Sequence, residues 1–93
     1  MFILTTSLIK NSFFIFCLLK QLKHNNEAEK FYELAVELRK DEPRSYSNLG
    51  AIYHLNGKYE MARQNYIIAL KLRPDDNITQ INLAKLNQKS VKK

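Results

Sequence analysis

Residues 43–76, with the sequence PRSYSNLGAIYHLNGKYEMARQNYIIALKLRPDD, contain two helical patterns separated by a short turn. In the first pattern apolar residues recur every three or four positions, which predicts one buried helix face: Tyr46, Leu49 and Tyr53. Asn56-Gly57 interrupts this pattern. The second pattern ends at Pro74, because proline cannot continue a helix. Its apolar positions are Tyr59, Ala62, Tyr66, Ala69, Leu70 and Leu72. The stretch therefore predicts two helices joined by a turn.

Composition restricts the class of protein. The chain has 93 residues, enough for one small domain, and only two glycines and two prolines, which together with the lack of strand-like alternation indicates an all-helical fold. Fifteen Lys and Arg against nine Asp and Glu give a net charge of +6. Because these charges are scattered along the chain, they indicate a solvated surface, and we expect no nucleic-acid binding.

Side chains suited to catalysis or metal binding are few. Cys17 is the only cysteine, so no disulfide can form within the chain, and its apolar neighbours predict a buried, inert thiol. Only His24 and His54 accompany it, so no metal site and no cofactor are expected. The sequence offers no Ser/His/Asp set and no glycine-rich phosphate loop, and by itself the chain is not expected to be an enzyme. The acids have the spacing of an exposed helix surface: Glu27, Glu29, Glu33 and Glu37.

An internal repeat connects the two halves of the chain. A single shift along the sequence superimposes Ala28 on Ala62, Tyr32 on Tyr66, Ala35 on Ala69 and Leu49 on Leu83. A fixed period of this length is typical of stacked helical hairpins, in which each hairpin buries its apolar face against its neighbour.

These residues resemble the tetratricopeptide repeat (TPR) family. That family places an aromatic residue, Leu-Gly and Tyr on a first helix, then Ala, an aromatic residue and Ala on a second helix that ends before Pro. In this chain those places are filled by Tyr46, Leu49, Gly50, Tyr53, Ala62, Tyr66, Ala69 and Pro74. The second half of an earlier repeat is matched by Ala28, Tyr32 and Ala35. Small residues at Gly50 and Ala62 indicate that the two helix backbones approach closely there.

The resemblance divides the chain into four parts. Residues 43–76 form a complete repeat, and residues 23–42 form the second helix of a partial one. Residues 1–22 form an atypical apolar helix, and residues 77–93 a capping helix with a basic tail, whose polar positions suit an outer face: Gln80, Asn82, Lys85 and Gln88. The expected fold is all-α, a short right-handed α-solenoid of TPR helical hairpins with a C-terminal capping helix.

The segment 1–22 leaves several alternatives open. A secretory signal would carry a basic residue before Lys10, and a membrane span would not be interrupted by the polar run from Lys10 to Ser12. The third alternative is a degenerate first repeat helix that packs against the next helix. Its apolar stripe would consist of Ile15, Leu18, Leu19 and Leu22.

Two departures from the repeat pattern affect this part of the chain. Phe16 stands at the position of Gly50, and Lys23 stands at the position of the turn glycine. A new helix is nevertheless expected to begin near Asn25 or Asn26, because asparagine caps helix starts. We also expect the chain to self-associate through its aromatic residues Phe13, Phe14 and Phe16.

The TPR resemblance implies a non-catalytic protein-interaction module with a concave peptide-binding groove. The first helix of the complete repeat would present to this groove Arg44, Ser47, Asn48, Ala51, His54 and Leu55. Asn48 would hydrogen-bond the backbone of an extended peptide, and Arg44 would meet a carboxylate. Most of the basic clamp with which some family members grip a chaperone's C-terminus is missing, so a chaperone tail is not the expected ligand. The identity of the ligand stays open.

A second, narrower resemblance concerns the end of the chain. The run NLGAIYHLNGKY, followed by PDDNITQINLAKL and a lysine-rich tail, looks like the C-terminus of the membrane-bound protein O-mannosyltransferases that carry lumenal TPRs. In that family a membrane domain transfers the sugar and the repeats recognise protein substrates. This resemblance implies a fragment on the lumenal side of the endoplasmic reticulum, membrane-associated through its full-length parent or through residues 1–22. Asn77 heads an N-glycosylation sequon compatible with that location; without the resemblance, a cytoplasmic location is expected.

Overall fold

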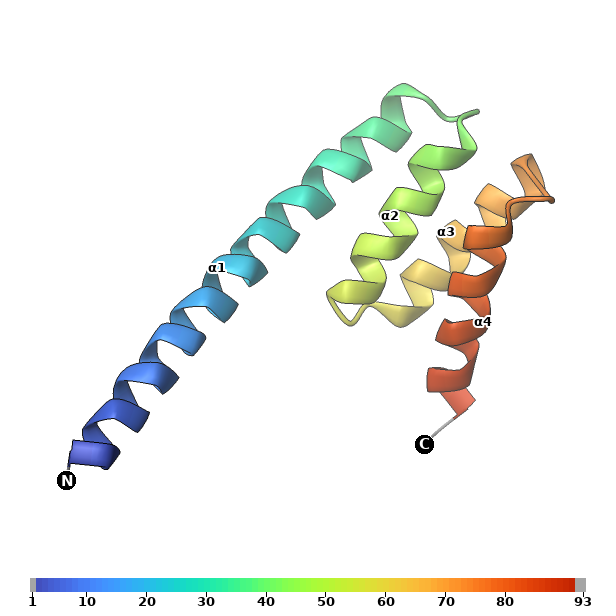
Figure 1. Cartoon of the computed structure of the whole chain (residues 1–93). Helices are drawn as coiled ribbons and strands as arrows, with labels where there is room; N and C mark the ends of the chain where they lie inside the picture. The colour runs from blue at the N-terminus through green and yellow to red at the C-terminus, as the bar shows by residue number, and fades with distance from the viewer. Residues whose placement is uncertain (1, 92–93) are drawn as a thin grey trace.

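The computed structural model describes the backbone of residues 2–91 and the side chains of residues 15–88. Within the described residues it has four helices and no strand: α1 (Phe2–Leu38), α2 (Pro43–Leu55), α3 (Tyr59–Leu72) and α4 (Asn77–Val91). The helices α2, α3 and α4 stack side by side, while only the second half of α1 lies against α2 (Figure 1). The predicted all-α solenoid of helical hairpins is confirmed.

The turn between α2 and α3 is closed by a glycine. Gly57 has a φ of +78°, a left-handed conformation that costs a residue with a side chain but not glycine. Its N–H donates to the carbonyl of His54 over 3.1 Å, and the next N–H, that of Lys58, donates to Tyr53 over 2.8 Å. These two bonds satisfy the free carbonyls at the end of α2 in the Schellman arrangement.

The core lies between α2 and α3 and includes one residue of α4. Its buried members are Leu49, Ile52, Tyr53, Ala62, Tyr66 and Leu86, with Ala28, Tyr32, Val36 and Leu83 packed against them. Ala69 is also buried, Ala35 and Tyr46 are partly buried, and Pro74 is exposed.

Gly50 lies at a close approach between α2 and α3. A Cβ atom at this position would lie 2.8 Å from two ring carbons of Tyr66 and 3.3 Å from the carbonyl oxygen of Ala62. Tyr66 is 1% exposed, so its ring has no room to move away. The absence of a side chain at Gly50 is therefore a condition for the hairpin to close.

The predicted boundary between residues 1–22 and 23–42 is not a break in the structure, because α1 runs through it. A new helix start at Asn25 or Asn26 is therefore wrong. Two features explain the continuity. No glycine or proline occurs before Pro43, and Lys23 stands where the complete repeat has Gly57, so the left-handed turn is unfavourable there.

The predicted packing of the first apolar stripe against the next helix is also wrong. Ile15, Leu18, Leu19 and Leu22 are between 48% and 61% exposed, and Cys17, predicted to be buried, is exposed. The side chains of Phe13 and Phe14 lie outside the described residues. Among the residues that are described, no helix is long and apolar enough to cross a membrane.

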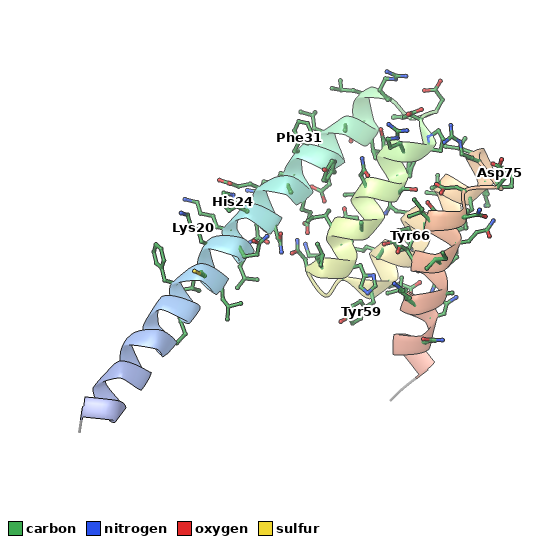
Figure 2. The ribbon with its side chains drawn as sticks, in the orientation of Figure 1. Lys20, His24, Phe31, Tyr59, Tyr66 and Asp75 are labelled. Atoms are coloured by element: carbon green, nitrogen blue, oxygen red, sulfur yellow. The ribbon has the colours of Figure 1, made fainter. Side chains whose placement is uncertain are left out.

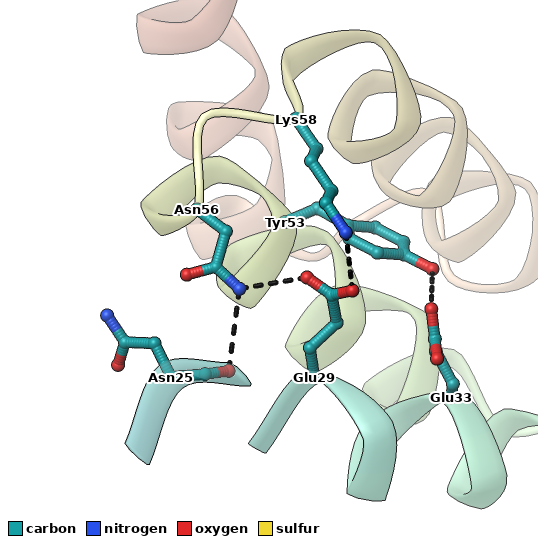
Figure 3. Close-up of polar contacts among 6 residues, drawn as sticks. All are labelled: Asn25, Glu29, Glu33, Tyr53, Asn56 and Lys58. Atoms are coloured by element: carbon teal, nitrogen blue, oxygen red, sulfur yellow. Dashed lines mark hydrogen bonds and ion pairs between the residues drawn. The ribbon is translucent and has the colours of Figure 1, made fainter. Parts of the chain in front are cut away.

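Polar contacts hold α1 to the hairpin (Figure 3). The buried carboxylate of Glu29 accepts hydrogen bonds from Lys58 Nζ over 2.6 Å and from Asn56 Nδ2 over 2.8 Å. One turn further along α1, Glu33 accepts a bond of 2.6 Å from the hydroxyl of Tyr53. The expectation that all four glutamates of this helix lie on an exposed surface is thus wrong for Glu29 and Glu33.

The environment of Glu29 changes the acidity of its carboxyl group. Burial raises the pKa, but the hydrogen bonds from Lys58 and Asn56 and the charge of Lys58 outweigh burial and leave the pKa below its ordinary value of 4.5. Because the folded state binds the proton more weakly than the unfolded chain, the stabilisation is fully present above pH 4.5. It is lost as the pH falls through the lower pKa of the folded state.

The close approach at Gly50 gives a first prediction. In an exposed helix a change from glycine to alanine stabilises by about 1 kcal/mol, whereas Gly50→Ala is expected to destabilise by about 2 kcal/mol because its methyl group overlaps the Tyr66 ring. Urea unfolding followed by circular dichroism measures the difference. The cost should shrink when the same change is made in a Tyr66→Leu background, which lacks the overlapping ring atoms. A stabilising Gly50→Ala would contradict the packing described here.

The contact between Glu29 and Lys58 gives a second prediction. Glu29→Gln removes the negative charge that faces Lys58 and is expected to lower the free energy of unfolding by about 1 kcal/mol at pH 7. The difference between the two proteins should vanish as the pH falls below the pKa of Glu29, measured by urea unfolding at several pH values. Glu37→Gln, a change at an exposed acid of the same helix, is the control. Equal effects of the two substitutions would refute a specific role for Glu29.

Candidate peptide-binding groove

The six predicted groove residues all belong to α2 and lie along two adjoining surface cavities between α2 and α4. One cavity, of about 320 Å³, is lined by Arg44, Ser47, Asn48, Ala51, Arg73, Asp76, Ile78, Thr79 and Asn82. The other, of about 420 Å³, is lined by Ala51, His54, Leu55, Tyr59, Tyr66 and Asn82. Ala51 and Asn82 border both, so the two cavities form one continuous groove.

Asn82 is the groove residue that sequence reasoning misplaced. It was expected on the outer face of the last helix, but it is partly buried and faces α2 across both cavities. The internal repeat contained the signal, since the shift that superimposes Leu49 on Leu83 also superimposes Asn48 on Asn82. The two amides therefore occupy equivalent positions on successive first helices of the array.

Thr79 forms the floor of the groove and fixes α4 against α2. Its side chain is 1% exposed, and its hydroxyl donates to Asp76 Oδ2 over 2.6 Å. Since the single hydroxyl proton is used in that bond, the 2.6 Å contact with Ser47 Oγ has Ser47 as the donor. The sequence did not reveal this role, because Ser47 and Thr79 are separated by 32 positions.

Asp76 caps the helix that carries this wall of the groove. It precedes the first residue of α4, and its Oδ1 accepts the backbone N–H of Thr79 over 3.2 Å. The two bonds from Thr79 lower the pKa of Asp76 below its ordinary value, so this carboxylate is held ionised and engaged within the protein. The charges left on the groove surface at this end are the exposed guanidinium groups of Arg44 and Arg73.

The opposite end of the groove is largely apolar. Leu55 is exposed, and Tyr59 meets His54 edge to face with ring centroids 5.6 Å apart. Tyr59 and Tyr66 of α3 both border this part of the groove. Within residues 15–88 no three His, Cys, Asp or Glu side chains gather in a way that would hold a metal ion.

The predicted glycosylation site lies beside the groove. Asn77 is exposed as the first residue of α4, whereas the threonine of its sequon is the buried Thr79. An enzyme that glycosylates asparagine must reach both residues, so the folded chain offers an incomplete site. Modification of Asn77 stays a prediction, and it would have to precede folding.

Comparisons with known proteins agree with this geometry. The tetratricopeptide repeat family matches residues 43–76 and, separately, residues 17–42. Protein O-mannosyl-transferase TMTC2 of Homo sapiens is 54% identical over 69 residues, and Protein O-mannosyl-transferase TMTC1 is 41% identical in Homo sapiens and 42% in Mus musculus over 71 residues. These matches cover 74% or 73% of this chain but only 8% of each relative.

The two repeat matches adjoin in sequence and together span residues 17–76, which contain the hairpin, most of the core and the α2 side of the groove. The similarity to the O-mannosyl-transferases extends over about three quarters of the chain. The chain therefore belongs to the tetratricopeptide repeat family, and it resembles a short part of the protein O-mannosyl-transferases TMTC1 and TMTC2.

Proposed function

We propose that this chain is a non-catalytic protein-interaction module that binds an extended peptide in the groove between α2 and α4. The observation that supports this most strongly is the equivalence of Asn48 and Asn82, which border the same cavity one repeat apart. An amide side chain both donates and accepts, so it can pair with a peptide group of a ligand whatever the ligand's side chains are. Two such amides in line would hold the backbone of an extended chain.

The charges along the groove favour a particular kind of peptide. Arg44 and Arg73 border one end, and a guanidinium group can pair with a carboxylate through two parallel hydrogen bonds. The nearby carboxylate of Asp76 is less available to a basic residue of the ligand, because Thr79 already donates a hydrogen bond to each of its oxygens. Leu55 and Tyr59 at the other end favour an apolar side chain. The preferred ligand is thus a peptide with an acidic residue a few positions from an apolar one.

Selection from a random peptide library tests this proposal. We expect the selected peptides to combine an acidic and an apolar residue, and Asn48→Ala or Asn82→Ala to weaken their binding by about tenfold each, the loss of roughly one hydrogen bond. Gln64→Ala, at an exposed position of α3, is the matched control and should leave the affinity unchanged. Fluorescence anisotropy with labelled peptides measures the affinities. Equal effects of all three substitutions would refute the groove as the binding site.

A second candidate function follows from the similarity to the O-mannosyl-transferases. In this proposal the chain is a lumenal repeat fragment of a membrane-bound protein O-mannosyltransferase, lacks the catalytic part, and assists the recognition of protein substrates. The identity of 54% over 69 residues supports it. The same groove would then bind an extended segment of a substrate protein in the lumen of the endoplasmic reticulum.

The location of the protein in cells tests this second candidate. We expect residence in the endoplasmic reticulum and a glycan on Asn77, seen as a gel shift that an endoglycosidase removes. Because Thr79 is buried in the folded chain, the glycan should be added during synthesis and not after folding. Asn77→Gln removes the acceptor and keeps the bonds between Thr79 and Asp76, so it is the suitable control. A protein found only in the cytosol would rule out this candidate and leave the peptide groove unaffected.

A further inference from the structure

The face of α1 that is turned away from α2 carries apolar side chains that nothing in the described chain covers. Phe16, Phe31 and Leu38 are each more than half exposed, and so is Leu34, which lies at the edge of this face and also borders a cavity between α1 and α2. On the same face lie Lys20 and His24, which point away from the hairpin together with Phe31 (Figure 2). The contacts that hold α1 to the hairpin run through Glu29 and Glu33 (Figure 3), and the helical repeat places these two residues on the opposite side of α1 from Phe31.

The residues of this outer stripe follow one another in a distinctive order. The stripe residues recur every three or four positions, a spacing that keeps them on one helix face. They are Phe16, Lys20, Lys23, Glu27, Phe31, Leu34 and Leu38. An apolar end is followed by a basic part, an acidic residue and a second apolar end. Lys20 Nζ lies 5.9 Å from the ring centroid of Phe16, so the basic part adjoins the first apolar end directly.

This order is complementary to itself when it is read in the opposite direction. We propose that two copies of the chain associate through an antiparallel pair of α1 helices centred between Lys23 and Glu27. In this arrangement Phe16 packs against Leu34 of the second copy, Lys20 meets its Phe31, and Lys23 pairs with its Glu27. Two-fold symmetry makes each of these contacts occur twice.

The architecture of the chain leaves the outer side of α1 exposed for this pairing. Lys20 and Phe31 of the stripe point away from α2 (Figure 2), and the helical spacing places Glu27 between them, so the hairpins of both copies point outward from the helix pair. Residues 16–38 of an uninterrupted helix extend over about 33 Å. A contact along that length is of the scale that a specific interface needs, on the order of 1,000 Å² in total.

The charge pattern favours a second copy over an anionic membrane. A membrane surface would select a stripe with basic residues alone, whereas Glu27 lies in the middle of this one with its side chain 63% exposed. In the antiparallel pair the same carboxylate meets Lys23 of the other chain. Glu27 thus disfavours binding to an anionic lipid surface and favours pairing with a second copy of the chain.

Sedimentation equilibrium of the full chain tests the association itself. We expect a concentration-dependent dimer, and Leu34→Glu should raise its dissociation constant on the order of 100-fold, because the two-fold axis places a carboxylate in both apolar ends. Leu55→Glu, a change at an exposed leucine of α2, is the matched control and should leave the dimer intact. Circular dichroism checks that both variants keep their helices. A monomer at every concentration, or equal effects of the two variants, would overturn the pairing.

Charge reversal tests the register. Lys23→Glu and Glu27→Lys each create two like-charge contacts and should weaken the dimer by about tenfold, while the double variant restores opposite charges and should recover the original affinity. Association through unspecific apolar contact would show no such recovery. A double variant that does not recover the original affinity would therefore refute the register.

Disulfide cross-linking tests the direction of the pair. Cys17→Ser removes the native thiol, after which one chain receives Phe16→Cys and another Leu34→Cys. An antiparallel pair brings these two cysteines together and keeps like cysteines roughly 27 Å apart along the helix axis. We therefore expect the mixed disulfide on oxidation. A prevalence of disulfides between identical chains would indicate a parallel pair and overturn the proposal.

Discussion

The whole structure depends on the close contact between the Gly50 backbone and the ring of Tyr66. Because no Cβ stands between them, α2 and α3 can approach until the ring fills the space beside Ala62 and becomes almost completely buried. A fully buried aromatic ring is a large share of the apolar contact in so small a core. Gly57 then closes the turn in the left-handed conformation. Because glycine has no Cβ, this conformation is not strained, and its cost is the conformational entropy that glycine loses on folding.

These two requirements, a small residue at the close approach and a glycine in the turn, also explain why residues 2–38 form one continuous helix instead of a hairpin. At the position of Gly50 it has Phe16, whose ring would occupy the space needed by Tyr32, and at the position of Gly57 it has Lys23. A hairpin is therefore opposed both by its packing and by its turn, and α1 continues as one helix. Its second half is held by polar contacts to the α2–α3 turn, while the first half extends from the solenoid, and its described apolar residues are exposed.

Much of the fold was accessible from the sequence, because its determinants are local or periodic. The helical spacing of Leu49 and Tyr53, the small residue at position 50 and the internal repeat all act within one hairpin or between equivalent ones. Contacts between distant side chains were not accessible. Glu29 meets partners 27 and 29 positions away, and Ser47 meets Thr79 at a separation of 32, so a sequence pattern alone could not distinguish these residues from solvated ones. The TPR resemblance predicts groove residues on α2, and these residues border the two cavities, while their role in binding a peptide stays a prediction. Asn82 borders both cavities as well, although the polar positions of the last helix predict an outer face for it.

We infer that the α2–α3 hairpin, closed by Gly50 and Tyr66, is the most stable unit of the chain, and that α1 and α4 dock on it. Native-state hydrogen exchange measured residue by residue tests this claim directly. In the monomer the slowest amides should lie in residues 49–53 and 62–69, with faster exchange in α4 and in residues 15–24 of α1. Slowest exchange in α1 or in α4 would contradict it, because the core would then lie outside the hairpin.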